Sequence, residues 1–151
     1  DILVIDMPPG TGDAQLTLSQ RAALAGALIV STPQDLALID ARKGLNMFRK
    51  VNVPLLGIIE NMSHFVCTEC GASHEIFGNG GARAEAAKLG VPFLGEVPLE
   101  IVIRTTSDEG TPIVASQPDS PHAAHYGAIA EAVLQTLERN TPKASPKIIV
   151  E

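Results

Sequence analysis

The alternation of short apolar segments with stretches of helical periodicity constrains the fold of this chain more than any other feature. Short strands are predicted at Ile2–Ile5, Ala27–Val30, Leu55–Ile59 and Phe93–Val97. Apolar runs without regular polar alternation are typical of strands that are buried on both faces. Strands that alternate with helices form right-handed βαβ crossovers. The sequence therefore predicts an α/β fold, a three-layer sandwich around a mainly parallel sheet.

Capping residues and apolar periodicity predict the helices between these strands. A first helix is expected from about Ala14 to Ala25 with Asp13 as its cap, and a short Ala-rich helix from Gly81 to Leu89. Asp35 precedes a helical stretch with one apolar face, made of Leu38, Ala41, Leu45 and Phe48. The last helix is expected over His122–Leu137 with a buried stripe made of Ala130, Val133, Leu134 and Leu137.

The residues at each end of the chain allow a separate prediction. Asp1 leads directly into the first apolar run without a preceding turn, and a domain rarely begins inside a core strand. We therefore expect the chain to be N-terminally incomplete. Residues 1–139 are expected to form one domain that carries an insertion at 62–80, and 105–120 to form a loop. Residues 140–151 are expected to be a loose tail, in which Ile148–Val150 could add a strand.

Composition excludes several classes of protein. Apolar residues make up 45% of the chain and charged residues 19%, which is typical of a globular protein. The net charge of −6 argues against a broad surface for nucleic acid or anionic membrane. No apolar run approaches the roughly 20 residues of a membrane span. Two cysteines within one four-residue window do not make a secreted disulfide framework, so we expect a cytoplasmic protein.

Polar residues and prolines follow the predicted strands directly. In a parallel sheet ligands bind at the carboxyl ends of the strands. The residues at those positions are Asp6, Thr32, Asn61 and Pro98. We expect all four to line one edge of the sheet.

The string DMPPGTGD at residues 6–13 is the first candidate site. A carboxylate such as Asp6 at the end of a strand can hold Mg²⁺ beside nucleotide phosphates. Pro8 and Pro9 stiffen the turn, and glycines such as Gly10 let backbone N–H groups approach a phosphate. The same string is also compatible with a strand, a rigid turn and a capped helix that bind no ligand.

Cys67 and Cys70 form the strongest chemical signal. In the pattern C-x-x-C-G one tight turn presents two thiolates, and Gly71 relieves the backbone. A [4Fe–4S] cluster or a tetrahedral zinc site needs four such ligands, which a symmetric dimer would supply. With His64 and His74 beside the pair, a mononuclear Cys₂His₂ zinc site in one chain is an alternative. A thioredoxin-like redox pair fits less well because no helical period follows.

Several strings together resemble one family, the Mrp/ApbC-type iron–sulfur carrier ATPases of the MinD-like, deviant Walker A group of P-loop proteins. Residues 6–13 look like its Walker B and switch II segment, and TPQDLA at 32–37 like the loop after the next strand. ENMS at 60–63, followed by CTEC at 67–70, resembles its Asn-Met segment and metal-binding cysteine pair. Phe77-Gly78 and GEVPL at 95–99 complete a pattern that covers residues 1 to about 138.

The resemblance implies a function and roles for individual residues. Asp6 would position Mg²⁺, Asp13 would help to organise switch II, and Asn61 would bind adenine with Pro98 against the base. Cys67 and Cys70 would hold a [4Fe–4S] cluster shared by a homodimer. Mg-ATP binding and hydrolysis in the intact protein would set the dimer geometry and so cluster loading and release. The expected partners are recipient iron–sulfur apoproteins and cluster scaffold proteins, with no nucleic acid and no membrane.

One departure from the family is large. Its glycine-rich phosphate loop, KGGVGKS, has no counterpart in these residues, and Gly78-Asn79-Gly80-Gly81 has no following Lys-Ser or Lys-Thr. We therefore expect this chain alone to be inactive as an ATP hydrolase. Two other functions remain as alternatives, a nucleotide-independent zinc-binding or scaffold module and a MinD-like partitioning ATPase. The tail after Asn140 is short and broken by proline, which disfavours the amphipathic membrane helix of the partitioning ATPases.

Overall fold

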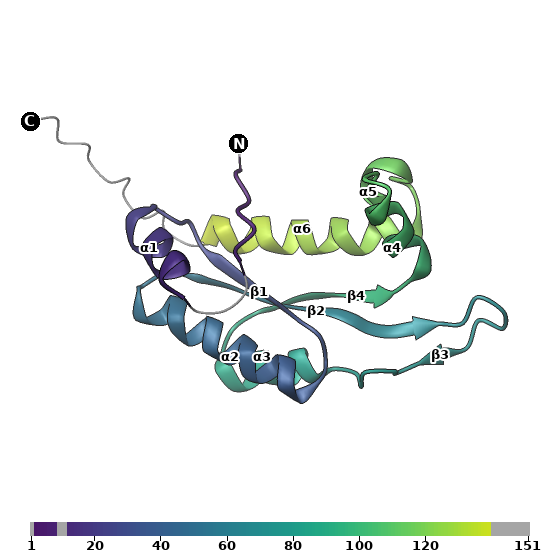
Figure 1. The fold of residues 1–151 in the computed structure, drawn as a ribbon, viewed down its shortest axis with the longest axis horizontal. Coiled ribbons are helices and arrows are strands. Elements are labelled where there is room, and N and C mark those ends of the chain that lie inside the picture. Colours follow the sequence, from purple (N-terminus) through teal and green to yellow (C-terminus); the bar gives the residue numbers. More distant parts are fainter. Residues whose placement is uncertain (1, 9–11, 140–151) are drawn as a thin grey trace, which may run out of the picture.

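The computed structural model describes residues 2–8 and 12–139, and these form a sheet with helices on both faces (Figure 1). In chain order the elements are α1 (Asp13–Arg21), β1 (Ala27–Ser31), α2 (Asp35–Lys50), β2 (Leu55–Val66), β3 (Ser73–His74), α3 (Gly81–Leu89), β4 (Phe93–Leu99), α4 (Ile101–Asp108), α5 (Ile113–Ser116) and α6 (Pro121–Arg139). The expected loose tail at 140–151 lies outside the described residues.

The central strand of the sheet is β2. It pairs in parallel with β1 on one side and with β4 on the other. The short strand β3 pairs antiparallel with the far end of β2, where Phe65 lies opposite His74. The predicted α/β fold with a mainly parallel sheet is thus confirmed.

Two neighbouring residues of β2 show why this strand is buried on both faces. Successive side chains of a strand point to opposite faces of the sheet. Ile58 belongs to a buried cluster with the α2 and α3 residues Leu38, Leu45, Ala82 and Ala86. Ile59 belongs to a second cluster, on the α6 side, with Leu94, Val97 and Ile129. The continuous apolar run in β2 therefore serves two separate cores, one on each side of the sheet (Figure 1).

Helices α2 and α3 agree closely with the prediction. All four residues of the predicted apolar face of α2 are buried, namely Leu38, Ala41, Leu45 and Phe48. Helix α3 begins at Gly81 and ends at Leu89 as expected. Gly90 ends it in the left-handed conformation with φ of 65°, which glycine adopts without steric cost.

The predicted strand at Ile2–Ile5 is wrong, because these residues form no regular structure. A strand needs the N–H and C=O groups of a neighbouring strand, and in the described part of the chain β1 pairs only with β2. Ile2–Ile5 instead line one wall of an apolar cavity of about 440 Å³, together with Leu24, Leu28 and Leu137. Leu3 and Val4 remain 84% and 83% exposed. An apolar run indicates a buried strand only where a pairing partner is present.

The first helix is shorter than predicted, and its cap is different. Helix α1 ends at Arg21 rather than near Ala25. Its N-cap is Gly12, and no side chain caps it. Asp13 lies in the first turn instead, where a negative charge interacts favourably with the helix dipole.

The predicted loop at 105–120 contains helical structure, since α4 extends to Asp108 and α5 follows a short break. Gly110 and Pro112 obscured the pattern, but they lie in the connection between the two helices. In α4 the hydroxyl of Thr106 donates to the carbonyl of Val102 at 2.9 Å, which keeps this polar residue compatible with a helix.

The final helix is longer than predicted, and its buried stripe is partly different. Val133 packs against the sheet and Leu137 is half-buried, as expected, whereas Ala130 and Leu134 are exposed. Ile129 and Tyr126 face the sheet instead. No helix within residues 2–8 and 12–139 has both the length and the apolar character that a membrane crossing requires.

Candidate functional site

Three of the four residues expected at one edge of the sheet do lie there. Strand register pairs Ser31 with Glu60, so Thr32 follows β1 beside Asn61. On the other side of β2, Asn61 pairs with Val97, which immediately precedes Pro98. Thr32, Asn61 and Pro98 thus come from three neighbouring strands to one place, as the strand-end rule predicts.

The side chain of Asn61 is oriented by its own backbone. Its Oδ1 accepts a hydrogen bond from the N–H of Met62 at 3.0 Å. Because the carbonyl end of the amide is engaged in this way, the Nδ2 end is presented as a donor of two hydrogens. Pro98 is buried next to it in β4. The site thus has a half-buried amide beside a buried proline.

Met62 marks a break in the regular pairing of β2. Its φ of 57° is left-handed, which is uncommon for a residue other than glycine. Between the pairs Asn61–Val97 and Phe65–Leu99, β2 advances four residues while β4 advances two. This is a β-bulge, a feature that redirects a strand and is common beside functional sites. It separates the part of β2 that pairs with β1 from the part that pairs with β3.

The described residues of the string at 6–13 are Asp6, Met7, Pro8, Gly12 and Asp13. Asp6 is exposed and lies in no strand, and Asp13 is exposed in the first turn of α1. Met7 and Pro8 line a groove of about 490 Å³ together with residues that include Ser31 and Thr32. The predicted contacts at Pro9 and Gly10 lie outside the described residues.

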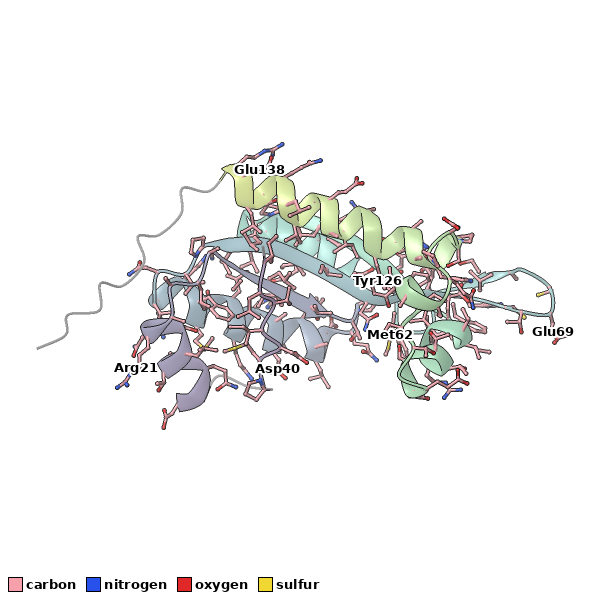
Figure 2. The ribbon with its side chains drawn as sticks, turned by 90° about the horizontal axis from the view of Figure 1, so that it is seen from above. Arg21, Asp40, Met62, Glu69, Tyr126 and Glu138 are labelled. Atoms are coloured by element: carbon pink, nitrogen blue, oxygen red, sulfur yellow. The ribbon has the colours of Figure 1, made fainter. Side chains whose placement is uncertain are left out.

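The two cysteines lie in the turn of a projecting hairpin, which we call the cysteine arm and define as residues 62–80. Its outward limb is the end of β2 and its return limb contains β3, so part of the expected unpatterned insertion forms a strand pair. Figure 1 shows the arm extending beyond the helices that cover the sheet. In Figure 2 Met62 lies where the arm leaves the body, and Glu69 lies at its tip.

Backbone hydrogen bonds close the turn that carries the cysteines. The N–H of Cys67 donates to the carbonyl of Ala72 at 2.9 Å, and the N–H of Gly71 donates to the carbonyl of Cys67 at 2.8 Å. Gly71 has φ of 71°, a left-handed conformation that this turn requires. Cys70 is exposed and Cys67 half-buried, and neither forms a disulfide. The turn holds both thiols at an accessible tip.

The environment of Cys67 favours its thiolate. The backbone N–H groups of Cys70 and then of Glu69 hydrogen-bond to its sulfur and lower the pKa of the Cys67 thiol below its ordinary value of 9.0. The Cys70 side chain contributes in the same direction. A thiolate is the form that binds metal ions.

The two histidines of the alternative zinc site do not join the cysteines. Nδ1 of His64 lies 3.1 Å from the hydroxyl of Ser63, near the base of the arm. His74 is exposed on β3, opposite Phe65. Among residues 2–8 and 12–139, no three His, Cys, Asp or Glu side chains are grouped so that they could hold a metal ion. This arrangement does not support the mononuclear Cys₂His₂ alternative.

The sequence interpretation missed Glu60, whose side chain is fully buried. Its Oε1 accepts a hydrogen bond from the N–H of Gly80 at 2.9 Å, and its Oε2 accepts one from the N–H of Ala82 at 2.7 Å. The available signal was a lone acidic residue that ends an apolar run. Carboxylates are almost never fully buried without partners, so such a residue indicates a specific contact.

Comparison with known proteins identifies the family. A family model described as the NUBPL iron-transfer P-loop NTPase matches residues 1–134. The chain is 53% identical to the iron–sulfur cluster transfer protein NUBPL of Dictyostelium discoideum, over 99% of this chain and 48% of that protein. It is also 53% identical to the iron–sulfur cluster carrier protein of Escherichia coli K12, over 91% of this chain and 37% of that protein.

A mitochondrial plant protein and two solved structures extend the comparison. The iron–sulfur protein required for NADH dehydrogenase of Arabidopsis thaliana is 56% identical over 91% of this chain and 44% of its own length. A nucleotide-binding protein from Archaeoglobus fulgidus, solved with ADP, matches with a TM-score of 0.66 and 38% identity, over 80% of this chain and 48% of that one. The Pyrococcus furiosus cell division ATPase MinD shares the fold, with a TM-score of 0.58 and 24% identity over 74% of this chain and 43% of that one.

These matches agree on the family and on the extent of the shared region. The chain spans about half the length of the curated relatives that it matches. The family model covers nearly all of the residues that the structure describes, including the cysteine arm and the Asn61 edge. The chain therefore belongs to the NUBPL iron-transfer family of P-loop NTPases.

Proposed function

We propose that this chain is part of an iron–sulfur cluster carrier, in which Cys67 and Cys70 of two copies hold one [4Fe–4S] cluster as cargo. The observation that carries the proposal is the cysteine turn at the tip of the projecting arm. It presents two thiols at an accessible position, and backbone N–H groups already favour the thiolate of Cys67. Relatives that share more than half of their aligned residues with this chain are named as cluster transfer or carrier proteins.

The number of ligands supports sharing of the cluster between two chains. A [4Fe–4S] cluster takes four thiolates, and this chain contains two. The described residues bring no third metal-binding side chain to the pair. A second copy related by two-fold symmetry would supply an identical pair, and the arm reaches beyond the helices of its own chain (Figure 1). The proposed assembly is therefore a homodimer with the two arms tip to tip.

We further propose that the complete protein binds Mg-ATP at the edge formed by Thr32, Asn61 and Pro98. The Nδ2 group of Asn61 would donate to an acceptor nitrogen of adenine, and Pro98 would pack against the ring. The solved relative from Archaeoglobus fulgidus was determined with ADP, which supports a nucleotide site in the family. Asp6 would hold Mg²⁺, Asp13 would organise the following helix, and Pro9 and Gly10 would lie against the phosphates. ATP hydrolysis would then regulate loading and release of the cluster.

The partners of such a carrier follow from its cargo. A cluster must be received from a scaffold protein and passed to recipient apoproteins. We propose the cytoplasm as its location, because free thiols at an exposed position require a reducing compartment. The net charge of −6 favours neither nucleic acid nor an anionic membrane as a partner.

Anaerobic reconstitution of the full chain with iron and sulfide tests the cargo. We expect a brown dimer with about one [4Fe–4S] cluster for every two chains, since four thiolates are required. Cys67→Ala and Cys70→Ala should lose both colour and cluster. His64→Ala and His74→Ala are the matched controls and should retain them.

Zinc binding is the competing outcome. One colourless zinc ion in each monomer, lost in the histidine variants and retained without a dimer, would overturn the proposal. Zinc bound by four cysteines across a dimer that never accepts iron and sulfide would also contradict it, while leaving the shared geometry intact.

A further inference from the structure

The contact between Glu60 and the start of α3 spans the cysteine arm. Glu60 lies in β2 immediately before Asn61, and its two backbone partners, Gly80 and Ala82, lie 20 and 22 residues later. Residues 62–79 of the arm, including both cysteines, lie between the two ends of this contact. The outward limb is anchored by β2 itself, so the contact with Glu60 fixes where the return limb rejoins the body.

The charge of Glu60 suits this position. The first N–H groups of a helix have no partner within the helix, and its N-terminus carries a partial positive charge. Two oxygens of one carboxylate accept two of these N–H groups, and charge-assisted hydrogen bonds of this kind are stronger than neutral ones. The side chain is fully buried, so solvent does not compete for it.

A close backbone contact fixes the same helix end from the other side. A Cβ atom on Gly81 would lie 2.5 Å from the carbonyl oxygen of Pro33, so only glycine allows this approach. Pro33 follows Thr32 in the loop after β1. The start of α3 is thus held between the loop after β1 and Glu60 of β2, next to the edge formed by Thr32 and Asn61.

We propose that Glu60 is a positioning residue for cluster binding: its carboxylate fixes the return limb of the cysteine arm, and so the direction in which Cys67 and Cys70 are presented. The inference rests on the proposed function. A cluster shared by two arms requires both thiol pairs to arrive at one point, and a loosened return limb would widen the range of positions that each tip samples. Loss of the contact should therefore weaken cluster retention even though Glu60 does not touch the cluster.

Glu60→Gln tests the inference, with Glu85→Gln as the matched control. Glutamine keeps the size of the side chain but replaces one acceptor by a donor, so one of the two N–H groups loses its partner. Glu85 is a second buried carboxylate, and it binds Arg42 on α2 rather than the arm. Both variants remove a buried carboxylate, one that binds the start of α3 and one that lies on α3, and both should lower the melting temperature.

Hydrogen exchange of the cluster-free full chain separates the two variants. In Glu60→Gln, amide exchange of residues 67–82 should become roughly tenfold faster than in wild type, as expected when a buried hydrogen bond is lost. In Glu85→Gln the faster exchange should be confined to α2 and α3. In the loaded protein, Glu60→Gln should release iron to a chelator several-fold faster than Glu85→Gln. If Glu60→Gln does not fold, Glu60→Asp, which keeps the charge but shortens the side chain, is measured in the same way.

These measurements distinguish a failure of the proposed role of Glu60 from a failure of the proposed function. Equal exchange of the arm in the two variants, or equal rates of iron release, would overturn the role of Glu60. If wild type accepts no cluster at all, the proposed function fails, whereas the exchange measurement still decides whether Glu60 fixes the arm.

Discussion

The guanidinium of Arg42 on α2 binds both carboxylate oxygens of Glu85 on α3. Nη2 of Arg42 lies 2.8 Å from Oε2 of Glu85, and Nε donates to Oε1. Glu85 is 3% exposed, whereas the Arg42 side chain is 46% exposed. The two helices that cover one face of the sheet are thus joined by a bidentate ion pair.

This pair predicts a pH dependence of stability. The hydrogen bond from Arg42 lowers the pKa of Glu85 below its ordinary value of 4.5, although burial opposes the shift. A lowered pKa in the folded state means that the contribution to stability is complete above the ordinary pKa. It is lost as the pH falls through the lower pKa of the folded state. Wild type should therefore be more stable than Glu85→Gln at neutral pH, and the difference should shrink below about pH 4.

Denaturant unfolding at several pH values measures this difference. Asp40→Asn is the control. Asp40 forms an exposed ion pair with Lys43 on the same helix, and such a pair should contribute little to the free energy of unfolding. The prediction would be contradicted if the two proteins, wild type and Glu85→Gln, differed by the same free energy of unfolding at neutral and at acid pH.

Two helical glycines should respond to alanine in opposite directions. In Gly81→Ala the new methyl group would meet the carbonyl of Pro33, so we expect a loss of about 1–3 kcal/mol in the free energy of unfolding. In Gly127→Ala, within α6, nothing lies within 4 Å of the new methyl group. Alanine should stabilise that helix by about 0.5–1 kcal/mol. Thermal or denaturant unfolding measures both changes in stability. If Gly81→Ala were more stable than wild type, the contact between Gly81 and Pro33 would not be close.

The part of the fold that depends on local pattern could be predicted from the sequence. Helix α3 was bounded correctly because an Ala-rich run ends at Gly90, and the edge at Thr32 and Asn61 followed from the rule for parallel strands. The predictions that were wrong or missing concern residues whose structure depends on partners elsewhere in the sequence. Ile2–Ile5 has the composition of a strand but pairs with none of the described strands. Residues 62–66, which show no clear period, continue β2 because β3 and β4 pair with this end of the strand. The burial of Glu60 likewise depends on backbone groups some 20 residues away.

The thiol of Cys67 should react as a thiolate at a lower pH than an ordinary cysteine. In a Cys70→Ser variant only Cys67 remains, and the N–H groups that stabilise its thiolate belong to the backbone and are retained. Its alkylation by iodoacetamide should reach half of its maximal rate below pH 9.0, the ordinary value. The same variant in denaturant is the control. Identical profiles in the folded and unfolded states would refute the stabilisation of the thiolate by the turn.

The exposed apolar segment at Ile2–Ile5 predicts self-association of the isolated 151-residue chain. Leu3 and Val4 are more than four-fifths exposed, and Val30 on β1 is 57% exposed. A double change, Leu3→Lys with Val4→Lys, should reduce association in sedimentation experiments because it removes a contiguous apolar patch. Leu36→Lys, at a single exposed leucine on α2, should leave association nearly unchanged. A wild-type chain that stays monomeric at high concentration would contradict this.

The same isolated chain should bind Mg-ATP weakly and should not hydrolyse it measurably. Its 151 residues contain no glycine-rich loop followed by Lys-Ser or Lys-Thr, and such loops provide most of the donors that stabilise phosphates. Isothermal titration measures the affinity. Tight binding that is abolished by Asp6→Ala would show that residues 6–13 suffice for the phosphates.

The cysteine arm grows out of a strand rather than a loop, and this sets rules for how its reach can change. A strand rises about 3.3 Å per residue, and its side chains alternate between two faces. Adding two residues to each limb would carry the thiols outward by roughly 7 Å and keep them on the same face. Adding one residue to each limb would turn them to the opposite face. In functional relatives each limb should therefore be longer or shorter by an even number of residues, even where the residues themselves differ.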